Sequence, residues 1–136
     1  FFDVNEIINE TDLTYDNAEA KIIAKACKRL IKDFHQVDFE GRIGIIVSDK
    51  KQKFNILKEF TKDTFIELEI DTLDTFQGRE KDIIILSCFC LCKGLNVALT
   101  RARCSLWIFG FSNTLVQNDS WKSLINDAKD RGCYPE

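Results

Sequence analysis

The sequence predicts an α/β fold in which a mostly parallel sheet lies between two layers of helices. Short apolar runs alternate along the chain with longer segments whose apolar residues recur every three or four positions. In addition, the run Ile83–Leu86 is apolar at every position, as expected for a strand covered on both faces of a parallel sheet. A three-layer sandwich of this kind binds its ligands beyond the carboxyl ends of the strands.

The expected elements follow from this alternation. Asn17 and Ser48 are plausible caps of the first two helices, and Gly132 is the expected C-cap of the last one. Alternating acidic and apolar residues place Phe65–Ile70 nearer an edge of the sheet. In chain order, we expect a strand at Phe1–Val4, a helix from Asn17 to Phe34, a strand at Arg42–Val47, a helix after Ser48 with Phe54, Leu57 and Phe60 on its inner face, strands at Phe65–Ile70 and Ile83–Cys88, a helix at Asn96–Arg103, a strand at Ser105–Phe109 and a helix at Ser120–Arg131.

Length and composition describe one soluble globular domain over residues 1–136. Hydrophobic residues make up 45% of the chain and charged residues 30%, and the longest uncharged apolar run is too short to span a bilayer. The net charge of −3 provides no basic footprint of nucleic-acid binding, although a cleft shared with another domain could still bind one. Because the sequence contains no methionine, we expect a fragment of a longer protein.

The six cysteines are expected to be reduced thiols of a cytosolic or nuclear protein, because an ample apolar core removes the need for disulfides. The alternating run Cys88–Cys92 invites a zinc interpretation, but zinc sites favour cysteines paired two to four residues apart in turns. We therefore expect no metal site. Trp107 and Trp121 are expected to be packing aromatics, and His35 a polar helix end.

Two polar clusters precede strands of the expected sheet, at Thr72–Glu80 and Asn96–Arg103. We expect both at the ligand-binding edge where the strands end. Arg101 and Arg103 would lie on a short helix, from which an arginine can direct its planar, permanently charged group at a phosphate. The spacing by itself favours the alternative, two solvated arginines on a surface helix.

The segments TLDTFQGREKDIIILS and LNVALTRAR resemble the fifth and sixth motifs of superfamily 1 RNA/DNA helicases, in the group that includes senataxin-like and nonsense-mediated-decay helicases. The segments SLWIFG and WKSLINDAKDR near the end of the chain are similar to senataxin-like helicases in particular. The resemblance implies the second RecA-like domain of a two-domain helicase, nuclear or cytoplasmic, that moves along single-stranded RNA or DNA. An N-terminal RecA-like domain of the same protein would be its partner.

The resemblance also implies a role for individual residues. ATP with Mg would lie between the two domains, and the missing N-terminal domain would supply the phosphate-binding loop, the catalytic acid and the metal site. The motif G-x-x-x-x-G-K-[ST] does not occur here, so this domain alone is expected to be inactive. The implied roles are Arg101 as an arginine finger on the γ-phosphate, Gln52, Gln77, Gly78 and Glu80 as nucleotide contacts with Glu80 near the ribose, and Ser48, Thr72 and Lys93 as nucleic-acid contacts.

Two departures from the helicase pattern leave an alternative open. The fourth motif, at Ile45–Gln52, lacks the usual Ser/Thr-Pro-Tyr ahead of its glutamine. The loop ahead of Asn96 is shorter than in the family and retains only Lys93 of a basic pair. The alternative is a degenerate, non-catalytic helicase-like scaffold that binds protein or nucleic acid. A third possibility, an unrelated α/β nucleotide-binding module, would need a glycine-rich phosphate loop that the sequence lacks.

Overall fold

The computed structural model describes residues 1–3, 15–39, 41–47, 49–60, 69–73, 75–76, 80–88, 99–110 and 112–134, with the backbone alone at 3, 15–18 and 88. Strands and helices alternate from β1 to β3, as the sequence predicts, whereas β3, β4 and β5 follow one another among the described elements. The elements are β1 (Phe2–Asp3), α2 (Tyr15–Asp33), β2 (Ile43–Val47), α3 (Lys50–Phe60), β3 (Glu69–Thr72), β4 (Lys81–Cys88), β5 (Ala102–Gly110), α5 (Ser112–Leu115) and α6 (Asp119–Asp130).

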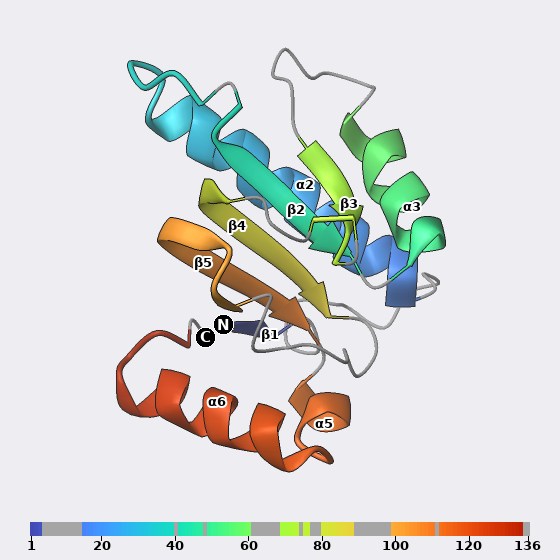
Figure 1. The fold of residues 1–136 in the computed structure, drawn as a ribbon, viewed down its shortest axis with the longest axis vertical. Helices are drawn as coiled ribbons and strands as arrows, with labels where there is room; N and C mark the ends of the chain where they lie inside the picture. The colour runs from blue at the N-terminus through green and yellow to red at the C-terminus, as the bar shows by residue number, and fades with distance from the viewer. Residues whose placement is uncertain are drawn as a thin grey trace.

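The strands form one five-stranded sheet in the order β1-β5-β4-β2-β3, and every neighbouring pair is parallel. Figure 1 shows β3, β2, β4 and β5 side by side with their arrowheads pointing the same way. The predicted α/β class is confirmed, and β3 lies at an edge of the sheet as expected. All described strands therefore begin at one edge, which we call the amino edge, and end at the other, the carboxyl edge.

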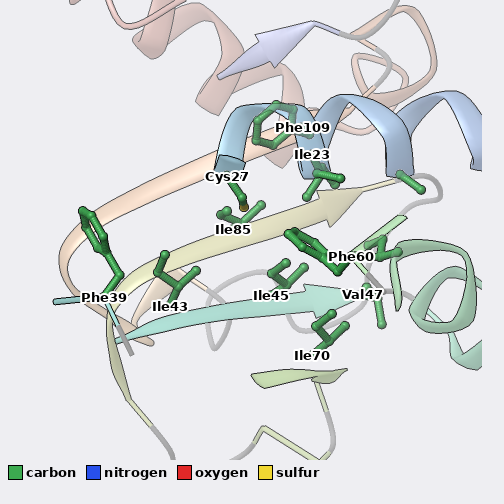
Figure 2. Close-up of a cluster of buried hydrophobic side chains, with 13 residues drawn as sticks. Ile23, Cys27, Phe39, Ile43, Ile45, Val47, Phe60, Ile70, Ile85 and Phe109 are labelled. Carbon is green, nitrogen blue, oxygen red and sulfur yellow. The ribbon is translucent and has the colours of Figure 1, made fainter. Parts of the chain in front are cut away.

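Helices α2 and α3 cover one face of this sheet. Side chains of β2 alternate between the two faces because successive residues of a strand point in opposite directions. Figure 2 shows Ile43 and Ile45 of β2 and Ile85 of β4 turned toward Ile23 and Cys27 of α2. The buried residues of this first cluster are Ala20, Ile23, Ala24, Cys27, Phe39, Ile43, Ile45, Val47, Ile56, Phe60, Ile70, Ile85 and Phe109.

The opposite face is covered by α5 and α6, and by a single aromatic side chain from the polar cluster before β4. Trp121 of α6 and Phe76 are both completely or almost completely buried there, and Trp121 is a packing residue as predicted. Asn118 caps α6 by accepting from the backbone N–H groups of Ser120 and Trp121. The buried residues of this second cluster are Phe1, Ile46, Phe76, Ile84, Leu86, Ile108, Leu115, Trp121 and Ile125.

The helices differ from the expectation mainly at their ends. Helix α2 begins at Tyr15 and not after Asn17, because the apolar periodicity locates the middle of a helix better than its first turn. Helix α6 spans Asp119–Asp130, one residue earlier than expected at each end. The C-cap is Arg131, and Gly132, expected in that role, comes one residue later with a φ of 70°, the left-handed conformation that suits glycine just after a helix.

The inner face of α3 was assigned wrongly in part. Its buried residues are Gln52, Ile56 and Phe60, spaced four apart, so the expectation holds for Phe60 alone. Phe54 is 59% exposed and Leu57 38% exposed. Each residue advances about 100° around a helix, so Phe54 lies on the side opposite Gln52. The exposed Phe54 ring is covered by the ammonium group of Lys58, 4.9 Å from its centroid.

The expected helix at Asn96–Arg103 extends too far. Ala102 and Arg103 belong to β5, and Arg101 lies in the bend just before it. The backbone N–H of Lys81 donates to the carbonyl of Arg101 at 3.1 Å, and Lys81 pairs with Ala102, so sheet pairing draws this segment into a strand. Both β4 and β5 begin earlier than their apolar runs, since backbone pairing continues where the side chains are polar.

Candidate functional site

Glu80 and Arg101 lie next to each other at the amino edge of the sheet. Glu80 immediately precedes β4, Arg101 immediately precedes β5, and the two strands are neighbours. Adjacent strands are about 4.8 Å apart, so the two side chains start from neighbouring backbones. We expected this pair at the carboxyl edge, which is wrong. A residue directly ahead of a parallel strand stands where the strand begins, whereas Thr72, at the end of β3, lies at the carboxyl edge.

The amino edge contains a chain of ion pairs. Arg103 Nε lies 3.5 Å from Glu80 Oε2, and Arg103 Nη1 lies 3.7 Å from Asp82 Oδ1. Arg42 Nε lies 3.6 Å from the other oxygen of Asp82. Because Arg103 and Glu80 are more than half exposed, each pair contributes at most about 1 kcal/mol to stability. The pairs balance charge along the edge and leave Glu80 accessible to a ligand.

Arg101 differs from these arginines. It forms no ion pair with any carboxylate in the described part of the chain, and its side chain is half-buried. Its Nε is buried and has no hydrogen-bond acceptor among the same residues. A buried donor without an acceptor costs about 1–3 kcal/mol, so this guanidinium suits an anionic ligand that supplies acceptor oxygens.

Thr72 lies at the carboxyl edge among polar side chains of α3 and the turn after β3. Its backbone N–H donates to Asp71 Oδ1 at 3.0 Å, and its hydroxyl lies 3.0 Å from that of Thr75. The ammonium group of Lys53 on α3 lies 3.5 Å from Asp71 Oδ1. A hydroxyl and a lysine at one edge can contact a phosphate backbone, and Lys53 was not among the nucleic-acid contacts expected from the sequence.

Thr72 and Glu80 therefore lie at opposite edges of the sheet. Thr72 pairs with Val47, and the register of β2 against β4 places this level one residue beyond Leu86. At about 3.3 Å per residue, that level is about 20 Å from Lys81, where β4 begins. The eight residues 73–80, which we call the strap, thus connect the carboxyl edge to the amino edge.

Phe76 attaches the strap to the sheet. Its ring is completely buried in the second cluster, and its backbone N–H donates to the carbonyl of Thr72 at 3.0 Å. It packs against Gly44 in the middle of β2, where an added Cβ would lie 2.6 Å from Phe76 Cζ. Leu73, the first residue of the strap, also packs against the second cluster, so two apolar side chains attach the described part of the strap.

Gln52 is not brought together with Glu80 and Arg101. It is 2% exposed near the carboxyl edge, and its Nε2 donates to Ser87 Oγ at 3.3 Å. The Ser87 hydroxyl in turn donates to Glu19 Oε1, and Ser87 and Glu19 are completely buried. Glu19 was not expected from the sequence, although it stands four residues before Ile23, on the apolar face of α2. We call these three residues the buried polar network.

The remaining expected site residues, Ser48, Gln77, Gly78 and Lys93, lie outside the described residues. The same holds for Cys90, Cys92 and the side chain of Cys88. Within the described ranges, no group of three or more histidine, cysteine, aspartate or glutamate side chains is arranged to hold a metal ion. None of the helices described there is both long enough and apolar enough to cross a membrane.

Two further features lie away from the polar edges. Burial raises the pKa of the Cys27 thiol to about 12, so this cysteine stays protonated and unreactive at neutral pH. An apolar hollow of about 400 Å³ lies between α2 and β5, bordered by Phe2, Leu30 and Trp107. It contains none of the expected site residues, and Trp107 packs against the first cluster as predicted.

Comparison with known proteins identifies the family. The family model described as an AAA domain matches residues 1–113, most of the chain and both polar clusters. Helicase SEN1 of Saccharomyces cerevisiae is 35% identical over 98% of the chain. The chain belongs to the AAA domain family and is a superfamily 1 helicase-like domain. The predicted RecA-like fold and the resemblance to senataxin-like helicases are thereby confirmed.

Other relatives of the helicase-like domain have related names. Probable helicase senataxin of Homo sapiens is 39% identical and ATP-dependent helicase NAM7 of Saccharomyces cerevisiae 35% identical, each over 85% of the chain. The chain spans 7% of Helicase SEN1, 5% of senataxin and 14% of NAM7. The alignment with Helicase SEN1 runs over 154 residues, more than the 136 of this chain, so the relative has insertions.

Proposed function

We propose that this helicase-like domain is the second motor domain of an ATP-dependent RNA or DNA helicase, with Arg101 as its arginine finger. The supporting observation is the state of Arg101 at the amino edge. Its neighbour Arg103 is neutralised by two carboxylates, whereas Arg101 has no carboxylate partner among the described residues and has a buried, unpartnered Nε. An arginine in this state is suited to stabilising the negative charge that develops on a transferred phosphoryl group. An arginine finger of this kind raises the rate of hydrolysis by a factor of about 10³–10⁵.

Glu80 would bind the ribose of the same nucleotide. A carboxylate accepts hydrogen bonds from sugar hydroxyls and is repelled by phosphates, so it belongs at the sugar end of the ligand. Glu80 is accessible, and its neighbour Arg103 holds it only through an exposed ion pair. Gln77 and Gly78 would contribute from the same strap, while an N-terminal RecA-like domain of the same protein would supply the phosphate-binding loop and the ligands of Mg.

The carboxyl edge would contact single-stranded RNA or DNA. Thr72 presents a hydroxyl there, and Lys53, paired with Asp71 at 3.5 Å, could turn its ammonium group to a phosphate at the same edge. Ser48 and Lys93 are further contacts on the grounds of their motifs. Contacts of this type position a nucleic-acid backbone without reading its bases. These contacts are compatible with a helicase that acts on RNA or on DNA, in the nucleus or in the cytoplasm.

The proposal is tested by ATP hydrolysis of the full-length protein with and without single-stranded RNA. Arg101→Ala should lower the stimulated rate by at least about a hundredfold, as expected for a lost arginine finger. Arg29→Ala is the matched control, because Arg29 is an exposed arginine of α2 whose ion-pair partner within the described residues is Asp33, one turn further along the helix. It should leave the rate unchanged. Single-stranded DNA in place of RNA identifies the preferred nucleic acid.

Two results would contradict the proposal. Equal rates in the wild type and Arg101→Ala would exclude the arginine finger. Turnover by the isolated 136 residues that survives Arg101→Ala would exclude an ATP site shared between two domains, because this domain alone is expected to be inactive.

The second candidate is a degenerate helicase-like scaffold that binds protein or nucleic acid without hydrolysis. The observation that favours it is the position of Gln52, which is buried and bound to Ser87 instead of facing the edge of Arg101. A folded wild-type protein that binds RNA but hydrolyses no ATP would establish this alternative.

A further inference from the structure

The helix layer over the first cluster is too narrow to cover all five strands of the sheet. Neighbouring helices pack about 10 Å apart and neighbouring strands about 4.8 Å apart, so two helices cover about four strands. Helices α2 and α3 lie side by side, where the Lys28 ammonium group donates to the carbonyl of Glu59 at 3.2 Å. Helix α3 adjoins β2 and β3, and α2 adjoins β4 and β5. The apolar hollow between α2 and β5 lies where this layer ends.

Apolar side chains line the hollow, which measures about 400 Å³. On its sheet side, the Phe2 ring stacks on Phe109 with centroids 4.6 Å apart and tilts against Trp107 at 5.8 Å. The Trp107 indole N–H donates to Ser105 Oγ at 2.9 Å, so the one polar group of this ring is already bonded. The helix side of the hollow includes a row of apolar residues of α2 one turn apart, Ile22, Ala26, Leu30 and Phe34.

The dimensions of the hollow match a helix. From Ile22 to Phe34, α2 advances by about 18 Å at about 1.5 Å per residue, which corresponds to about three turns. The Phe34 ring is 51% exposed at the end of this row, an unusual position for a large apolar side chain without a partner. A third helix packed beside α2 would cover this ring and complete the layer over β5.

The exposed side of α2 next to the hollow is positively charged. Lys21, Lys25, Arg29 and Lys32 are all exposed. Arg29 pairs with Asp33 at 3.5 Å, whereas Lys25, which borders the hollow, has no ion-pair partner among the described residues. The net charge of the whole chain is −3, so this positive charge is a local feature of α2. Charge complementarity therefore favours an occupant with acidic side chains on the flank that faces α2.

We propose that this hollow is the docking site of an acidic amphipathic helix of a partner protein. Apolar residues of that helix, recurring every three or four positions, enter the hollow, and its glutamates or aspartates face Lys25 and Arg29. Nucleic acid fits less well, because apolar walls offer no hydrogen bonds to its polar base edges and phosphates. The hollow contains none of the residues assigned to nucleotide or nucleic acid, so this proposal is independent of the proposed function.

The test measures the binding of two matched peptides to the full-length protein by fluorescence anisotropy. Both peptides have about 15 residues, a lactam bridge that holds the helix, and leucine and phenylalanine on one face. The flanking positions are glutamate in the first peptide and lysine in the second. The glutamate peptide should bind at least about tenfold more tightly than the lysine peptide. A peptide of the same composition as the glutamate peptide but in shuffled order, without an apolar face, should not bind.

Two variants with matched controls locate the bound peptide. Lys25→Glu should weaken binding of the glutamate peptide by about tenfold and strengthen binding of the lysine peptide. Lys122→Glu, on α6 over the opposite face of the sheet, should change neither. Phe34→Ala should weaken binding of the glutamate peptide by about fivefold or more, whereas Phe54→Ala removes a ring of similar exposure on α3 and should have no effect. All four residues are exposed, so the variants should fold.

Several results would overturn the proposal. They are no binding of the glutamate peptide, equal binding of both peptides, or equal losses in the variants and their controls. Binding to the 136-residue chain but not to the full-length protein would also do so, because another part of the same polypeptide would then occupy the hollow. A Lys25→Glu variant that loses affinity for polyuridylate, in a protein that binds no peptide, would assign the positive side of α2 to nucleic acid instead.

Discussion

The two edges of the sheet use polar residues in opposite ways. At the amino edge, Glu80 and Arg103 are more than half exposed and paired at 3.5 Å. At the carboxyl edge, Glu19, Gln52 and Ser87 are at most 2% exposed and hydrogen-bonded to one another. Exposed charges can exchange partners with a ligand at little cost, whereas buried polar groups are committed to the fold. The nucleotide contacts are therefore expected at the amino edge, whereas the buried polar network at the carboxyl edge is expected to stabilise the fold.

The largest expected effect separates two arginines of the amino edge. Arg101→Lys should lower ATP hydrolysis of the full-length protein by about a hundredfold, because an ammonium group replaces a planar fork with a point charge. Arg103→Lys should change the rate by less than about threefold, since an exposed ion pair tolerates the exchange. Equal losses in the two variants, measured at saturating ATP, would mean that Arg101 has no special position.

An intermediate effect is expected at the carboxyl edge. Ser87→Ala removes the link between Gln52 and Glu19 and should lower the free energy of unfolding by about 1–3 kcal/mol. Ser123→Ala, on the exposed side of α6, should change it by less than about 0.5 kcal/mol. Urea unfolding of the 136-residue chain measures both. Similar midpoints for Ser87→Ala and the wild type would show that the buried polar network does not stabilise the fold.

The smallest effect concerns Glu80 and distinguishes binding from catalysis. Glu80→Ala should raise the KM for ATP by about tenfold, the value of one or two hydrogen bonds to a charged group, and lower kcat by less than about threefold. The free energy of unfolding should stay nearly unchanged, because Glu80 is exposed. A large fall in kcat with an unchanged KM would contradict the assignment of Glu80 to the ribose.

The elements of the fold were largely predictable because their patterns are local. The apolar run of β4 and the periodicity of α2 can be read from residues next to each other in the chain. The inner face of α3 was partly wrong, because Phe54 and Gln52 break the usual distribution of apolar and polar residues. Gln52 is buried only because Ser87, 35 residues later, accepts its hydrogen bond.

The candidate site was likewise predictable only in part. Its residue types, above all Glu80 and Arg101, were recognisable from two motifs of the sequence. Their location was not, because the edge on which a loop lies depends on the direction of the strands and on the pairing of Lys81 with Ala102. The contact between Phe76 and Gly44 could not be predicted either, because the sequence does not show which side chain packs on a glycine within a strand.

The sequence by itself determined the α/β alternation, the apolar strands and the helicase motifs, since each depends on residues close together along the chain. Only the tertiary structure decided that Thr72 and Glu80 stand at opposite edges, that Glu19 meets Gln52 and Ser87, and that Phe76 occupies the space above Gly44. These contacts join residues 32 to 68 positions apart in the chain, and packing in three dimensions, not local pattern, selects such partners.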